Sequence, residues 1–128
     1  MAMSFLCFRT AVLLGLIGFC LGIGMGMAQD FALVQAHAHL NLLGWVSFFL
    51  YGAFYHLVPR AALGPWPKFH YGLSLVGAVT MVTGIAGIMK GYAGFESVAI
   101  AGSLVALTGF LAFVVIVFRS GPVFLANE

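Results

Sequence analysis

Residues 34–45 read VQAHAHLNLLGW and place two histidines, His37 and His39, at the start of an almost uninterrupted apolar run. Ionisable side chains at membrane depth are costly and usually mark function. Each helical residue advances about 100° around the helix axis, so residues two apart point about 200° away from each other. The two imidazoles therefore cannot bind one metal ion together. As ligands, they would serve two different sites on opposite flanks of one helix.

The composition of the whole chain is that of a membrane protein. Its 128 residues are 63% hydrophobic and only 6% charged, whereas soluble domains carry about a quarter charged residues. A helix needs roughly 20 apolar residues to cross a bilayer. We therefore expect an all-α, four-helix transmembrane bundle formed by a single domain over residues 1–128. The expected spans are about 5–27, 31–58, 68–89 and 98–118.

The first span has an alternative interpretation. Arg9, the apolar segment and the small residues Gly26 and Ala28 before Gln29 also fit the pattern of a secretory signal peptide. We favour a transmembrane helix. Closely spaced glycines in spans one, three and four predict close helix packing, and we interpret Cys7 and Cys20 as small buried residues.

The charged residues predict the orientation of the bundle. The net charge is +2, and a basic stripe of the kind that binds nucleic acid is absent from the sequence. Four basic residues fall at one face of the bundle: Arg9, Arg60, Lys68 and Arg119. The other face holds Lys90 with Asp30 and Glu96. Because cytoplasmic loops are rich in Lys and Arg, we expect both termini in the cytoplasm and the multi-pass chain in a bacterial-type inner membrane.

His37 and His39 lack a second imidazole within the chain. The other histidines are His56 and His70, and His56 is roughly 28 Å from His37 along a helix. A second copy of the chain would supply the missing ligand, with His37 of one copy facing His39 of its neighbour. Contacts between two different patches close into rings, which favours a cyclic homo-oligomer. Two opposed imidazoles suit a haem iron better than zinc, which takes four ligands.

Two alternatives remain open at this point. The two histidines would be purely interfacial if they only formed hydrogen bonds with water, Gln35 or Asn41. A dimer in which identical histidines meet across a twofold axis is the second alternative.

The second span resembles a helix of a known family. His39-Leu40-Asn41-Leu42-Leu43, followed by Tyr55-His56-Leu57-Val58-Pro59, is similar to the second transmembrane helix of the haem–copper oxidase catalytic subunit. The nitric oxide reductase branch is the most similar. The resemblance covers about 25 residues, and the other spans agree only in character and order.

The resemblance implies that His39 is an axial ligand of a low-spin haem b. The family's catalytic subunit has twelve helices in three pseudo-equivalent arcs of four, and its tenth helix carries a His-x-His pair that serves two neighbouring haems. This chain is similar to one arc, so a cyclic homotrimer would mimic the whole subunit. Three haems, each bound by His37 and His39 of adjacent copies, would use every histidine of the pair. A copper site is therefore less expected.

Three functions remain after this reasoning. The first is a haem b-binding membrane cytochrome that transfers electrons with an unidentified donor or acceptor. The second is a minimal oxidase-like oxygen or nitric oxide reductase, and the third is a membrane assembly or structural subunit without catalysis. For the haem propionates we expect Lys90 and Tyr92 as donors, with Gln29 and Gln35 less favoured; Asn41 would bond an imidazole or a backbone carbonyl. We interpret His56 and His70 as interfacial side chains, with a weak shared metal site as the alternative.

Overall fold

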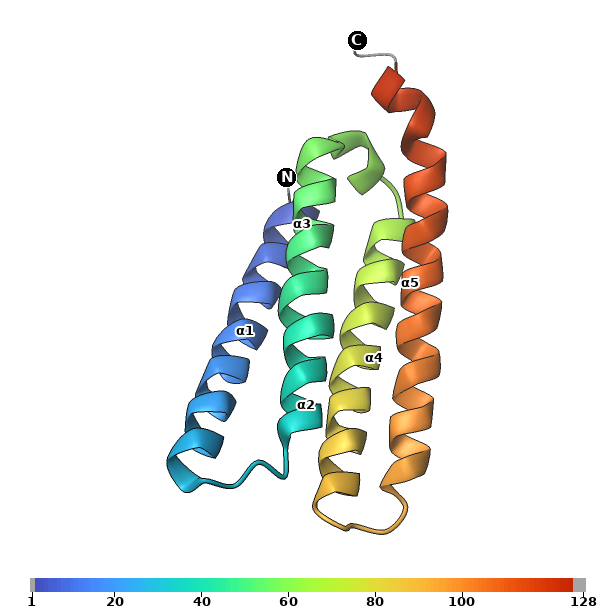
Figure 1. Cartoon of the computed structure of the whole chain (residues 1–128). Helices are drawn as coiled ribbons and strands as arrows, with labels where there is room; N and C mark the ends of the chain where they lie inside the picture. The colour runs from blue at the N-terminus through green and yellow to red at the C-terminus, as the bar shows by residue number, and fades with distance from the viewer. Residues whose placement is uncertain (1, 126–128) are drawn as a thin grey trace.

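The computed structural model describes residues 2–125, with side chains as far as Gly121, and its regular elements are all helices. The first long helix is α1 (Ala2–Ala28). The second is continuous and consists of α2 (Val34–His39), the π-helical η1 (Leu40–Val46) and α3 (Ser47–Leu57). A short 3-10 helix, η2 (Pro59–Ala62), leads to α4 (Trp66–Met89), and α5 (Phe95–Leu125) follows. Figure 1 shows the two chain ends at one end of the bundle and the loops after α1 and α4 at the other.

Four helices in the described part of the chain are long and apolar enough to cross a membrane: Ala2–Ala28, Val34–Leu57, Trp66–Met89 and Phe95–Gly121. Large apolar side chains cover their outer surface, as Met27 (83% exposed) and Phe118 (81% exposed) illustrate. Such a surface is stable against lipid and not against water. The all-α, four-span prediction is confirmed, as expected for a multi-pass membrane protein.

The helix ends follow from local backbone chemistry. α3 ends at Leu57, directly before Val58 and Pro59, because the residue before a proline is pushed away from helical geometry. α4 ends in a turn in which Gly91 has a φ of +77°, a conformation that suits glycine. The helix α5 continues through Pro122 to Leu125, beyond the expected end of span four near residue 118.

α4 and α5 pack backbone against backbone. A Cβ atom added to Gly84 would clash with the amide nitrogen of Ala99, and one added to Gly102 would clash with that of Met81. Only glycine allows such an approach, as is common between membrane helices. The prediction of close packing at these glycines is confirmed.

Near the end of the bundle where the termini lie, buried side chains fill the space between the other helices. This core is formed by buried residues from α1, α3 and α5: Met3, Cys7, Ala11, Phe48, Tyr51, Tyr55 and Ile116. The hydroxyl of Ser4 donates to the carbonyl of Gly52 at 2.9 Å and joins α1 to α3. Cys7 is buried as predicted, whereas Cys20 is exposed on the outer surface of α1, so that part of the cysteine prediction is wrong.

Candidate functional site

His37 and His39 lie on α2 and line two different cavities. His37 lines a cavity of about 640 Å³, here called the His37 cavity, together with Phe19, Gly22, Ile23, Ala38, Asn41, Leu42 and Trp45. His39 lines a cavity of about 440 Å³, the His39 cavity, with residues of η1, α3, α4 and α5: Leu43, Ser47, Tyr51, Ser74, Ala78, Met81, Ser103, Ala106, Leu107 and Phe110. The divergence of the two imidazoles that the spacing predicts is therefore present in the structure.

Both cavities open on the outer surface of the bundle. Ile23 (63% exposed) and Leu42 (60%) border the His37 cavity, and Leu107 (53%) and Phe110 (51%) border the His39 cavity. The volumes fall in the range of about 300–1,000 Å³ that is usual for ligand sites. Each cavity is thus an open, mostly apolar recess with one imidazole in its wall.

The imidazole of His39 is held in one tautomer. Its Nδ1 lies 2.8 Å from the backbone carbonyl oxygen of Gln35. A carbonyl oxygen can only accept, so Nδ1 carries a hydrogen, and in the neutral imidazole Nε2 carries the lone pair. A histidine that binds a metal usually donates its other ring N–H to such a carbonyl, because this bond fixes the ring. His39 is therefore ready to act as a ligand through Nε2.

The imidazole of His37 packs against Asn41 and α1. Asn41 Nδ2 donates to the backbone carbonyl of His37 at 2.9 Å and lies 3.4 Å from each ring nitrogen. A Cβ atom on Gly22 would lie 2.9 Å from Cε1 of His37, and one on Gly18 would lie 2.6 Å from Oδ1 of Asn41. Asn41 therefore sits beside both the imidazole and the backbone carbonyl that were expected as its partners, and glycines of α1 make room for both side chains.

A π-helical segment helps to keep the residues that line each cavity on one side of the helix. His37, Asn41 and Trp45 line one cavity at intervals of four residues, and His39, Leu43 and Ser47 line the other. In an α-helix, four residues turn by about 400°, so the directions of side chains four residues apart differ by about 40°. The i→i+5 bonding of η1 takes more residues per turn and reduces that difference. Ser47 Oγ donates to the carbonyl of Leu42 at 2.8 Å at the end of η1.

Lys90 and Tyr92 lie in the loop after α4, at the same end of the bundle as α2 (Figure 1). Lys90 Nζ is 3.6 Å from Oδ2 of Asp30, so it joins the two loops of that end. The backbone N–H of Ala32 donates a hydrogen bond to Asp30 Oδ1 at 3.0 Å. This bond and, after it, the positive charge of Lys90 lower the pKa of the Asp30 carboxyl. Tyr92 is 63% exposed. Both donors thus remain near the surface, at the level of the polar edge of the bundle.

The two remaining histidines are separated from this site and differ from each other. His56 is exposed and lines a cavity of about 570 Å³ beside the start of α1. His70 is completely buried, and its Nδ1 lies 3.0 Å from the hydroxyl of Tyr55. The interpretation of His70 as interfacial is therefore wrong. Residues 55 and 70 lie within about one or two helical turns of the loop that joins α3 to α4. Positions at similar distances from a short loop face each other in an antiparallel hairpin, so the contact between these two residues could have been predicted from the sequence.

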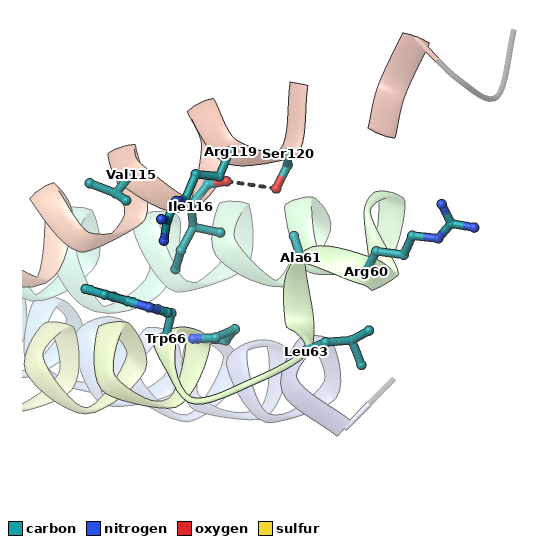
Figure 2. Close-up of a pocket in the computed structure, with 9 residues that line it drawn as sticks. Arg60, Ala61, Leu63, Trp66, Val115, Ile116, Arg119 and Ser120 are labelled. Atoms are coloured by element: carbon teal, nitrogen blue, oxygen red, sulfur yellow. Dashed lines mark hydrogen bonds between the residues drawn. The ribbon is translucent and has the colours of Figure 1, made fainter. Parts of the chain in front are cut away.

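A fourth cavity, of about 200 Å³, lies at the end of the bundle that carries the termini. It is bordered by η2, the start of α4 and the C-terminal part of α5. In Figure 2, Arg60 extends away from Trp66 and Arg119, so the two guanidinium groups do not converge on one point. The arrangement does not form a paired-arginine anion site.

Within residues 2–121, no group of three or more His, Cys, Asp or Glu side chains is close enough to hold a metal ion. No family model, curated protein or solved structure matches the chain. The site is therefore interpreted from its own geometry.

Proposed function

We propose that this protein is a membrane cytochrome in which His37 of one copy and His39 of the next would hold the iron of a haem b between adjacent copies of the chain. The observation that carries the proposal is the position of the two imidazoles in separate, outward-opening apolar cavities on opposite flanks of one helix. Each cavity offers one nitrogen ligand to a group that lies partly outside the chain. A neighbouring copy would complete both the cavity and the ligand set.

The residues in place fit a haem. The Nδ1–H of His39 donates to Gln35 at 2.8 Å and leaves Nε2 for an iron. Phe19 and Trp45, whose ring centroids are 5.3 Å apart, give the His37 cavity an aromatic wall suited to an apolar macrocycle. Lys90 and Tyr92 are the candidate donors for the propionates. Haem iron bound in this way supplies one-electron redox chemistry.

The proposed assembly is a cyclic homotrimer. A contact that joins the His37 flank to the His39 flank is heterologous, and such contacts close into rings when the rotation allows. The resemblance of the second span to the haem–copper oxidase catalytic subunit supports three copies, because that subunit contains three arcs of four helices. Two histidine ligands on each iron leave no open position for oxygen or nitric oxide, so electron transfer is the proposed activity.

The proposed orientation places both termini in the cytoplasm of a bacterial-type inner membrane. Arg60 and Lys68 flank the loop at the same end of the bundle as the termini, and Arg9 and Arg119 lie near the chain ends. The opposite end carries Lys90, which is paired with Asp30. The excess of basic residues at the end with the termini supports this orientation.

The hydrogen bonds of His37 and His39 are also those expected of purely interfacial histidines, so the test must detect the cofactor itself. Protein purified from haem-replete cells should show the sharp reduced absorption bands of a six-coordinate low-spin haem b and should not bind carbon monoxide. Both His37→Ala and His39→Ala should lose the bands, whereas His56→Ala should keep them. A colourless wild-type protein, or unchanged bands in either of the first two variants, would contradict the proposal.

A further inference from the structure

The interior of the bundle contains an imidazole that the proposed haem site does not use. His70 is 0% exposed, its Nδ1 is 3.0 Å from the Tyr55 hydroxyl, and its Nε2 has no hydrogen-bond partner. The ring stacks on Phe113 with centroids 5.0 Å apart and meets Tyr51 edge-on with centroids 4.5 Å apart. A buried polar atom without a partner is rare and points to a ligand or a function.

A second unpartnered atom lies one turn further along α4. Ser74 is 6% exposed, and its Oγ also lacks a hydrogen-bond partner. Ser74 lines the His39 cavity together with the hydroxyl-bearing residues Ser47, Tyr51 and Ser103. Buried water in proteins binds where several such polar groups surround a space large enough to hold it. Ser74 therefore lies between the buried polar cluster and the His39 cavity, which is large enough to hold water.

The opposite side of the cluster faces another cavity. Tyr55 and His56 line the cavity of about 570 Å³ near the start of α1, at the end of the bundle where the termini lie. Tyr55 is itself completely buried. The hydrogen-bonded pair of Tyr55 and His70 thus lies between two cavities, one that reaches the bundle end and one that reaches His39.

We propose that Tyr55, His70 and Ser74 form a proton relay in which water is the ligand that joins Ser74 to His70 Nε2. A neutral imidazole accepts a proton at one nitrogen and releases one from the other, and a phenol both donates and accepts. In the proposed step, the water beside Ser74 passes a proton to His70 Nε2 and receives one from the His39 cavity, while the Nδ1 proton passes to the Tyr55 oxygen. The former hydroxyl proton of Tyr55 leaves toward the His56 cavity. One proton enters, one leaves, and His70 ends neutral in its other tautomer; rotation of the ring, with its hydrogen bonds re-formed, restores the first tautomer before the next proton.

The relay does not depend on haem and uses no carboxylate. The acidic residues among the described ones are Asp30, in a loop, and Glu96, in the first turn of α5. Imidazole, phenol and the thiol of Cys7, which packs in the same core as Tyr55, are therefore the titratable groups at the level of this cluster, and the relay uses the first two. The reverse direction uses the same atoms, so the relay conducts according to the gradient.

The test is proton flux into liposomes that contain the purified protein and a trapped pH-sensitive dye, driven by a potassium diffusion potential. Wild-type protein should raise the flux at least about threefold above that of protein-free vesicles, since the relay offers a path that lipid does not. Tyr55→Phe, which removes one hydroxyl and keeps the ring, should return the flux to the vesicle background. His70→Phe should do the same.

Tyr71→Phe is the matched control, because the Tyr71 hydroxyl bonds Thr10 at 2.7 Å outside the relay. It should retain the wild-type flux. Ser74→Ala should lower the flux, because it removes the hydroxyl that binds the proposed water. The proposal is overturned if wild-type flux equals the background, if Tyr71→Phe loses as much flux as Tyr55→Phe, or if Ser74→Ala conducts normally. A colourless protein that conducts protons would contradict the haem proposal and support this one.

Discussion

The α4–α5 hairpin and the α1–α2 hairpin are both rich in glycine, but the glycines face different partners. In the first hairpin, Gly84 and Gly102 face the backbone of the opposite helix. In the second, Gly18 and Gly22 face the side chains of Asn41 and His37. The first interface is closed along these glycines, whereas the second borders a cavity of about 640 Å³ that contains an imidazole.

This difference shows that the residue opposite a glycine decides what the glycine does. Ala99 opposite Gly84 allows the helices to touch, so the pair gives tight packing of the kind that drives association in lipid. The side chains of Asn41 and His37, opposite Gly18 and Gly22, instead border a cavity. The α4–α5 hairpin is thus suited to support the fold, and the α1–α2 hairpin to hold a ligand.

The largest effect should come from filling the closed interface. Gly84→Ala or Gly102→Ala forces a methyl group into the backbone of the opposite helix and should lower the free energy of unfolding by about 3 kcal/mol, the upper part of the usual range for overpacking. Gly72→Ala, on the same helix as Gly84 with nothing near its Cβ, should change it little. Reversible unfolding in mixed detergent micelles measures both. Equal stability of Gly84→Ala and Gly72→Ala would remove the distinction between the hairpins.

Filling the open interface should instead affect the ligand. Gly22→Ala places a methyl group 2.9 Å from His37 Cε1, so the ring must move. If His37 binds haem as proposed, its displacement should weaken haem binding by about tenfold, or about 1.4 kcal/mol, with a smaller effect on unfolding. Gly24→Ala, two residues along α1 with open space around it, is the control and should bind haem normally. Haem titration followed by absorbance distinguishes the two, and equal affinities would contradict the role given to Gly22.

A smaller effect is expected where α1 meets α3. The buried hydroxyl of Ser4 donates to the carbonyl of Gly52 at 2.9 Å, and Ser4→Ala leaves that carbonyl without this partner. The free energy of unfolding should fall by about 1 kcal/mol. Ser103→Ala removes a hydroxyl that bonds only within its own helix, to Ala99, and should cost less. Unfolding curves of the two variants test the comparison; a larger loss in Ser103→Ala would contradict it.

The smallest effect should be the pH dependence of the contact between the two loops. The hydrogen bond from the Ala32 N–H and, after it, the charge of Lys90 lower the pKa of Asp30. The ionised carboxylate is therefore more stable in the folded protein than in the unfolded chain. This contribution is fully present above the ordinary carboxyl pKa and is lost as the pH falls through the lowered one. Asp30→Asn should therefore be slightly less stable than wild type at neutral pH and equally stable in strong acid. A difference that persists in acid would show that the charge is not its source.

The sequence was sufficient to predict the spans and the divergence of the histidines, because both follow from helix geometry and apolar length. The fourth helix is longer than the expected span, because α5 continues through Pro122 to Leu125. The π-helical segment η1 has no distinctive residue pattern, since Leu40–Val46 would also suit an α-helix.

The burial of His70 depends on contacts between helices. The same is true of whether a glycine faces the backbone or a side chain of the neighbouring helix. His70 is buried because Tyr51, Tyr55 and Phe113 surround its ring. Spacing within one helix does not reveal which residues of another helix lie opposite. The same limit applies to Gly22 and Gly84, which differ only in the side chains that face them.

The most direct test of the account is complementation between the two ligand variants. His37→Ala and His39→Ala chains would be produced separately and together, and the haem content of each purified assembly would be measured by absorbance and native mass spectrometry. If each haem takes His37 from one copy and His39 from the next, either variant alone should be colourless. In a random mixture, half of the copies keep each ligand, so about one quarter of the sites should be intact. A mixture as colourless as the single variants would contradict ligation between copies.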